Sequence, residues 1–134
     1  MRDEGGLAYS VFSYLSPGKY GAGLTMSAQT RTAEVSKVTD ILRHEATRLG
    51  REPVTDAELS LAKSYLIGSF PLRLNTAAKV ADFLVAVEEL GLGLDYADRY
   101  RERIAAVTAA DVQRVAARYY VPDTFDQVVV GNLP

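Results

Sequence analysis

An alternating run near the N-terminus, Gly6 to Leu15, constrains the fold of this chain more than any other stretch. The run predicts a strand with Leu7, Tyr9 and Val11 on one face and Ala8, Ser10, Phe12 and Tyr14 on the other. Aromatic and β-branched residues in alternation are typical of a half-buried strand. A connection rich in Gly and Pro, roughly Ser16 to Gly21, leads to a second alternating run over 22–29. The pair predicts a β-hairpin whose loop is longer than a two-residue turn.

After the hairpin, apolar residues recur at spacings of three and four, which predicts a series of helices. The first expected helix covers 30–49, with Thr32 as N-cap and Gly50 as stop, and the second covers 55–70, with a Thr55–Glu58 capping box and an end at Pro71. The third is capped by Asn75 or Thr76 and ended by Gly91 and Gly93. The fourth covers 95–106, and a short fifth helix is opened by Thr108 to Asp111. A final strand is expected over Phe125 to Gly131, where three consecutive valines predict burial on both faces.

The resulting element order is β-β-α-α-α-α-α-β, which predicts an α+β fold in one domain over 1–134. Three strands are fewer than the roughly four to six of a usual sheet. The residues Arg2-Asp3-Glu4 resemble the last turn of a helix, ended by Gly5 or Gly6. We therefore expect a partial domain, truncated at its N-terminus, whose sheet edge is covered by another chain or by an upstream part.

Composition excludes several classes of function. With 15 basic and 17 acidic residues, the chain lacks the charge excess of a nucleic-acid-binding protein. It has no cysteine, so disulfides, cysteine zinc sites and iron–sulfur clusters are excluded. No apolar run approaches the roughly 20 residues of a membrane-spanning helix, and no signal peptide is visible. The compartment stays open between cytoplasm and periplasm.

Few residues suggest chemistry. The single histidine, His44, cannot form the paired-histidine zinc motif of a metalloprotease helix and is interpreted as a solvated or boundary helix residue. We predict no catalytic residue and no metal ligand in this chain. Arg2 and Tyr9 remain, since a guanidinium and a phenol could together hold a peptide carbonyl or a carboxylate. From the residues alone, a helix-end charge and an ordinary strand residue are the favoured interpretation of this pair.

Several segments, in order, resemble the pitrilysin/insulinase family of inverted zinc metallopeptidases, which includes mitochondrial processing peptidase and insulin-degrading enzyme. The segments that carry the resemblance are Arg2 to Val11, Thr55 to Leu59, Ala62-Lys63, Leu66 to Phe70, Leu94 to Tyr96, Arg99-Tyr100, Arg103-Ile104, Val107-Thr108 and Asp111-Val112. They span nearly the whole chain and correspond to the family's C-terminal module. The resemblance implies a two-layer sandwich, with helices covering a mostly antiparallel sheet.

The resemblance also implies a role for Arg2 and Tyr9. In this family one half carries zinc through a His-x-x-Glu-His helix, and the zinc-free half contributes an Arg and a Tyr, seven residues apart, that bind peptide substrate. Arg2 and Tyr9 have that spacing. The implied partners are therefore a peptide and a zinc-binding half, either upstream on the same polypeptide or on a separate subunit.

Three hypotheses follow. The leading one is the zinc-free, substrate-binding portion of a zinc metalloendopeptidase, inactive by itself because it lacks zinc ligands. The alternative is a non-catalytic scaffold subunit of a larger complex, in which Arg2 and Tyr9 only support the fold. A third is a free-standing α/β binding module, which a stable monomer would favour, whereas a homodimer through exposed strand edges would indicate a truncated unit.

Overall fold

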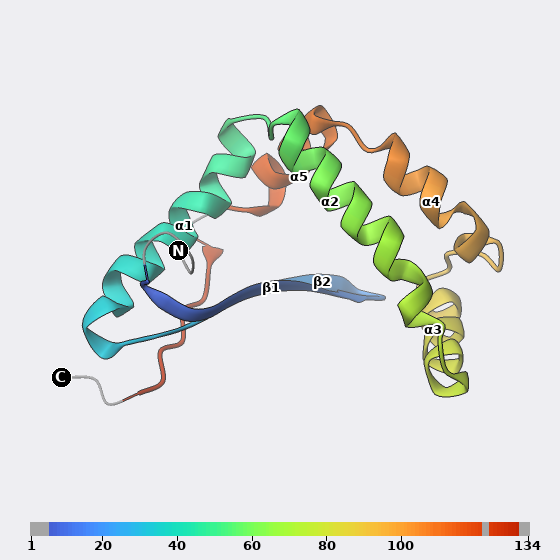
Figure 1. Cartoon of the computed structure of the whole chain (residues 1–134), viewed down its shortest axis with the longest axis horizontal. Coiled ribbons are helices and arrows are strands. Elements are labelled where there is room, and N and C mark those ends of the chain that lie inside the picture. Colours follow the sequence, from blue (N-terminus) through green and yellow to red (C-terminus); the bar gives the residue numbers. More distant parts are fainter. Residues whose placement is uncertain (1–5, 122–123, 132–134) are drawn as a thin grey trace. The chain divides into compact units, whose positions relative to one another are not determined.

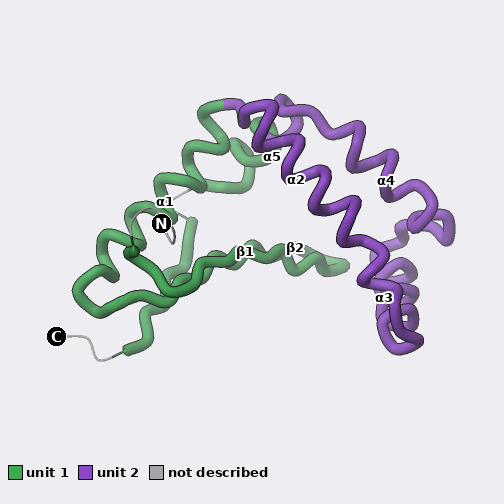
Figure 2. The backbone as a smooth tube through the Cα atoms, viewed as in Figure 1, with its two compact units in different colours: residues 1–52, 113–134 green, residues 53–112 purple. Residues whose placement is uncertain are grey.

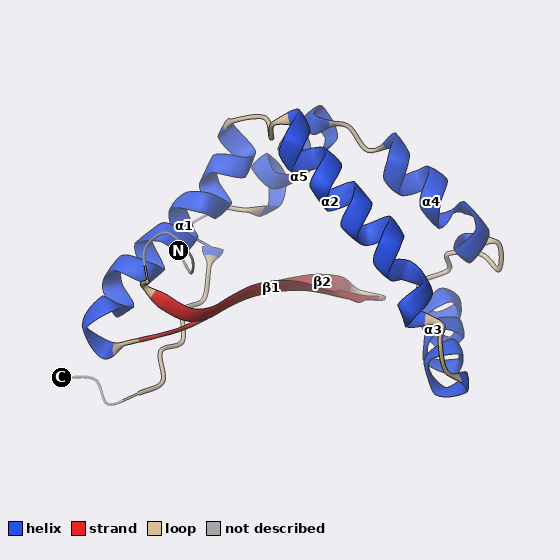
Figure 3. Ribbon diagram, in the orientation of Figure 1, coloured by secondary structure: helices blue, strands red, loops and turns tan. Residues whose placement is uncertain are grey.

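The computed structural model describes residues 6–121 and 124–131, and its helices and strands are drawn in Figures 1 and 3. The elements are β1 (Ala8–Gly18), β2 (Gly21–Thr30), the 3₁₀ turn η1 (Thr32–Glu34), α1 (Val35–Arg51), α2 (Asp56–Ser69), the 3₁₀ turn η2 (Phe70–Arg73), α3 (Ala77–Glu89), α4 (Tyr96–Ala106) and α5 (Ala109–Tyr119). The two strands form one antiparallel sheet. The predicted α+β class is confirmed.

The chain divides into two compact units, which Figure 2 distinguishes by colour. Unit 1 comprises residues 1–52 and 113–134, and unit 2 comprises residues 53–112. Unit 1 therefore contains the hairpin, α1 and most of α5. Unit 2 contains α2, η2, α3 and α4.

The hairpin of unit 1 turns more tightly than the sequence predicts. Gly18 pairs with Gly21, which leaves only Lys19 and Tyr20 between the strands. Neither residue has a positive φ, so the turn is not one of the primed types that usually close two-residue hairpins. A side chain at Gly18 would put its Cβ 3.0 Å from the carbonyl oxygen of Gly21. Glycine therefore lets the ladder continue to the turn, and the longer loop expected from Ser16 is wrong.

Both predicted ends of the first helix also need correction. Thr32 begins η1, and the N-cap position of α1 is occupied by Glu34, whose side chain makes no capping hydrogen bond. Gly50 does not stop α1, which continues to Arg51. A Cβ at Gly50 would lie 2.9 Å from the Cα of Ala117 in α5. Glycine is therefore needed here for close packing of two helices within unit 1.

The core of unit 1 consists mainly of small side chains. Its buried apolar residues are Ala8 on β1, Val38 and Ala46 on α1, and Ala116 on α5. Small side chains let the backbones of neighbouring elements approach closely, as at Gly50. Between α1 and α5, Gln113 also donates a side-chain hydrogen bond of 3.0 Å to the carbonyl oxygen of Arg51.

The capping signals predicted for α2, α3 and α5 are confirmed. At α2, the Thr55 hydroxyl accepts from the Glu58 amide and the Glu58 carboxylate accepts from the Thr55 amide, as a capping box requires. Thr108 and Asp111 make the same reciprocal pair of bonds at the start of α5. Thr76, one of the two candidates, caps α3 through the amide of Lys79.

Helix α3 ends at the predicted glycines. Gly91 has φ +61° and Gly93 has φ +88°, values that glycine adopts without steric cost. The amide of Gly91 donates to the carbonyl of Glu88, and that of Leu92 donates to the carbonyl of Val87. These two bonds form a Schellman motif, which satisfies carbonyls that the helix end would otherwise leave free.

The core of unit 2 is a set of contacting aromatic rings. The ring of Phe70 stacks on Tyr100 with a centroid distance of 4.0 Å and meets Phe83 edge-on at 5.8 Å. Tyr96 completes the set, at 6.0 Å from Tyr100 and 6.2 Å from Phe83. Residues from η2, α3 and α4 thus meet in one cluster. Pro71 ends the α-helical part of α2 as predicted, and this places Phe70 at the junction of α2 and η2.

The predicted final strand is absent from the described residues. Residues 125–130 have no regular secondary structure (Figure 3), and the side chains of Val128 and Val130 are 84% and 93% exposed. The segment lies along α1, where the Gln127 amide accepts from Arg43 at 3.3 Å and donates to Thr39 at 3.5 Å. A strand requires a pairing partner, and in the described sheet β1 and β2 pair only with each other. The expected burial of this segment on both faces is therefore wrong.

Candidate functional site

Tyr9, a predicted site residue, lies at a β-bulge in β1. Ala8 pairs with Thr30 and Ser10 pairs with Gln29, so Tyr9 is an extra residue with no partner on β2. The predicted strict alternation of faces therefore breaks at this residue. A bulge bends its strand and changes the direction of a side chain, and bulges are frequent near active sites. The Tyr9 side chain is 86% exposed, whereas Ala8 beside it is buried.

The backbone before the bulge is held by two features. Gly6 has φ +54°, a left-handed conformation that side-chain-bearing residues rarely adopt. One residue later, the Thr30 hydroxyl donates a hydrogen bond to the carbonyl oxygen of Leu7. No signal in the sequence singles out Thr30, because nothing in it indicates which residue of the second strand lies opposite the bulge.

The exposed phenol of Tyr9 is chemically available. A phenol can donate one hydrogen bond and accept others. Among the described residues, none forms a hydrogen bond with Tyr9 or packs a ring against it. The side chain can therefore donate to a carbonyl or carboxylate oxygen of a bound molecule without breaking a bond to any described residue.

The other predicted site residue, Arg2, lies outside the described residues. The Arg2–Tyr9 pair therefore stays a prediction.

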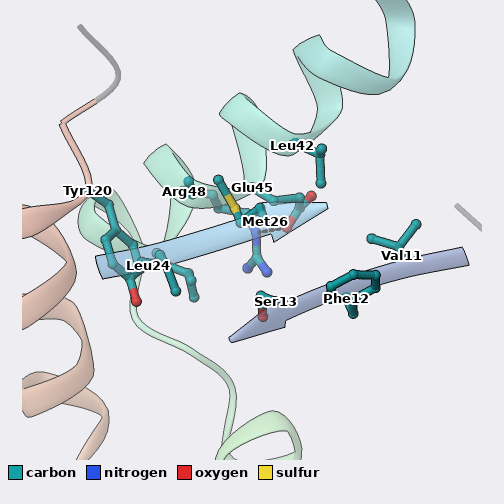
Figure 4. Close-up of a pocket in the computed structure, with 11 residues that line it drawn as sticks. Val11, Phe12, Ser13, Leu24, Met26, Leu42, Glu45, Arg48 and Tyr120 are labelled. Atoms are coloured by element: carbon teal, nitrogen blue, oxygen red, sulfur yellow. Dashed lines mark hydrogen bonds and ion pairs between the residues drawn. The ribbon is translucent and has the colours of Figure 1, made fainter. Parts of the chain in front are cut away.

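An apolar pocket of about 370 Å³ lies within unit 1, between the hairpin and α1 (Figure 4). Its lining residues are Val11, Phe12, Ser13, Leu24, Met26, Leu42, Glu45, Ala46, Arg48, Leu49 and Tyr120. The charged groups in this lining are Glu45 and Arg48, which form an ion pair with an Nε–Oε2 distance of 3.0 Å. Tyr9 is not part of the lining. The pocket suits apolar groups, and its polar side chains are Ser13, Tyr120 and the paired Glu45 and Arg48.

The remaining polar residues do not assemble a metal site in the part of the chain that the structure describes. His44 is an exposed residue of α1, as predicted. Over residues 6–121 and 124–131, no group of three or more His, Asp or Glu side chains could hold a metal ion. In the same residues, no helix has the length and apolar content needed to cross a bilayer.

Comparison with known proteins points to one family. Residues 1–66 match the family described as the peptidase M16 inactive domain. An uncharacterized zinc protease of Streptomyces coelicolor is 36% identical over 118 residues, which cover 87% of this chain. The match covers 25% of that relative, so the chain spans about a quarter of its length. The family match includes Gly6, Tyr9 and Thr30, the residues at and around the bulge.

Proposed function

Because this chain belongs to the pitrilysin/insulinase (M16) peptidase family and carries its inactive domain, we propose that it is the zinc-free, substrate-binding portion of a zinc metalloendopeptidase. The observation that carries this proposal is the phenol of Tyr9, which is 86% exposed on a β-bulge within the matched residues. Bulges occur often next to active sites, where they redirect a side chain, and an exposed phenol at such a position can reach a ligand.

In the proposed role, the Tyr9 hydroxyl donates a hydrogen bond to a carbonyl oxygen of the bound peptide. Arg2 supplies a second, charged donor. Negative charge develops on that oxygen as the peptide bond is cleaved, and donors already in position stabilise the charge without a cost of reorganisation. The two residues thus lower the barrier and hold the peptide in register.

Zinc does not fit the described residues of this chain, which form no metal-binding group. The proposed source of the metal is a zinc-binding half, either on the same polypeptide or on a second subunit. The chain by itself is then expected to hydrolyse nothing.

A second candidate function is a non-catalytic scaffold, and exposed apolar side chains on unit 2 favour it. On α2, Leu61 and Tyr65 are 73% and 72% exposed and lie one helical turn apart. Large exposed apolar residues that share a face are a common mark of protein–protein contact. A scaffold needs this contact but does not need the hydroxyl of Tyr9.

The two functions are distinguished by Tyr9→Phe, made in the protein together with its zinc-binding half. We expect peptide turnover to fall about 100- to 1,000-fold, because one donor to the developing charge is lost. The zinc content, measured by metal analysis, should stay unchanged. Arg2→Ala should lower turnover in the same way.

Tyr20→Phe is the matched control, since Tyr20 is 95% exposed in the turn of the same hairpin. Its turnover should equal that of the unaltered protein. Normal turnover in both Tyr9→Phe and Arg2→Ala would reject the substrate-binding role and favour the scaffold.

A further inference from the structure

Thr30 is joined to the strand that carries Tyr9 by a long-range hydrogen bond. Its hydroxyl donates to the carbonyl oxygen of Leu7, although the two residues are 23 positions apart in the sequence. Thr30 is the last residue of β2 and the ladder partner of Ala8, the first residue of β1. The bond therefore lies at the end of the sheet, beyond the last backbone pair.

This position matters because the bulge weakens the same end of the ladder. Within the described ladder, only the Ala8–Thr30 pair lies beyond the bulge, and the next pair is Ser10 with Gln29. The bulged residue itself is left unpaired. A single terminal pair next to a bulge would fray, since strand ends have few hydrogen bonds to hold them.

The direction of the Tyr9 side chain depends on the backbone on both sides of it. On its C-terminal side, the continuous ladder from Ser10 onwards fixes the chain. On its N-terminal side, the fixed points among the described residues are the buried methyl group of Ala8 and the Thr30–Leu7 bond. Of these contacts, only the Thr30–Leu7 bond depends on a single side-chain hydroxyl. A substitution at Thr30 therefore removes it without changing any residue next to Tyr9.

We propose that Thr30 is a positioning residue for Tyr9: its hydroxyl holds the carbonyl of Leu7 and thereby keeps the bulge closed and the phenol aimed at the substrate. This inference rests on the proposed function of Tyr9. It adds a residue from the second strand to the site, and that residue does not touch the substrate.

The test is a double-mutant cycle between Thr30→Val and Tyr9→Phe, in the protein together with its zinc-binding half. Valine keeps the branched shape of threonine and removes only the donor. We expect Thr30→Val to lower kcat/KM about three- to ten-fold, the effect of one lost hydrogen bond, and to act on the same parameter, kcat or KM, as Tyr9→Phe. Thr30→Ser keeps the donor and should stay within about two-fold of the unaltered protein.

In the Tyr9→Phe background, Thr30→Val should have no further effect, because a positioning residue acts only through the group that it positions. A general loss of folded protein would instead lower turnover by the same factor in both backgrounds. If Thr30→Val does not fold, as judged by circular dichroism, Thr30→Cys replaces it, since a thiol is a weak donor of similar size. The expected order of turnover is then Thr and Ser above Cys.

The outcomes separate the two claims. Normal turnover of Tyr9→Phe overturns the proposed function of Tyr9 and, with it, the role of Thr30. Reduced turnover of Tyr9→Phe with normal turnover of Thr30→Val overturns the positioning role alone. The positioning role is also overturned if the double variant loses turnover by the product of the two single losses. A loss of turnover in Thr30→Ser overturns it as well.

Discussion

At the scale of single residues, two glycines in helices face opposite surroundings. Gly50, near the end of α1, has the backbone of Ala117 against it, at 2.9 Å from a Cβ built at this position. Gly68, near the end of α2, has no atom within 4 Å of its built Cβ. The same substitution should therefore change stability in opposite directions at the two positions.

We predict that Gly50→Ala destabilises the protein by about 1–3 kcal/mol, because the new methyl group meets backbone atoms that cannot rotate away. Gly68→Ala should stabilise it by about 0.5–1 kcal/mol, since alanine loses less backbone entropy in a helix and finds open space here. The measurement is the midpoint of urea unfolding of each variant, monitored by circular dichroism. Equal shifts of the same sign would contradict the close packing of α1 against α5.

At the scale of elements, the start of α2 depends on a capping box. The Thr55 hydroxyl accepts from the Glu58 amide at 3.2 Å, and the Glu58 carboxylate accepts from the Thr55 amide at 2.8 Å. An exposed helix start has backbone amides with no partner inside the helix, and these two bonds satisfy two of them. The cap therefore contributes to unit 2, where α2 leads into the aromatic cluster through Phe70.

We expect Thr55→Ala to reduce stability by about 1 kcal/mol, in the usual range for removing a cap. Thr55→Ser should preserve most of the stability, because the hydroxyl remains. Ser60→Ala is the matched control, an exposed hydroxyl residue inside the same helix; it should be neutral or slightly stabilising. Thermal unfolding measured by circular dichroism compares the three variants, and an unchanged midpoint for Thr55→Ala would show that the cap does not limit stability.

At the scale of the whole molecule, the described residues leave many large apolar side chains in water. Leu15 on β1 is 64% exposed, and Leu61 on α2 is 73% exposed. Both long edges of the two-stranded sheet are unpaired within the described residues. An unpaired edge offers backbone donors and acceptors to another strand and favours association.

We predict that the chain alone forms a homodimer through its strand edges at micromolar concentration. Leu15→Lys should shift it towards monomer, since a charged residue on an edge strand opposes edge-to-edge pairing. Leu61→Lys places the same charge on a helix and should leave association unchanged. Sedimentation velocity distinguishes these results. A monomeric unaltered chain would favour the free-standing binding module, and dissociation by Leu61→Lys alone would locate the contact on α2 instead.

The sequence by itself determined several local features of this protein. The cap at Thr55, the end of α3 at Gly91 and the break at Pro71 each depend on groups within a few residues along the chain. Such groups act in the same way in any fold, so their pattern is sufficient to predict them. The prediction of Tyr9 as a site residue rests on a family motif, which is also a local feature.

Only the tertiary structure decided what depends on residues far apart in the sequence. The bulge at Tyr9 and the bond from Thr30 follow from the register between two strands, which alternation cannot specify to one residue. Gly50 lies within α1 with the backbone of α5 close against it, and residues 125–130 pair with no described strand. In each case the deciding atoms belong to another element, and their positions are set by packing rather than by the neighbouring sequence.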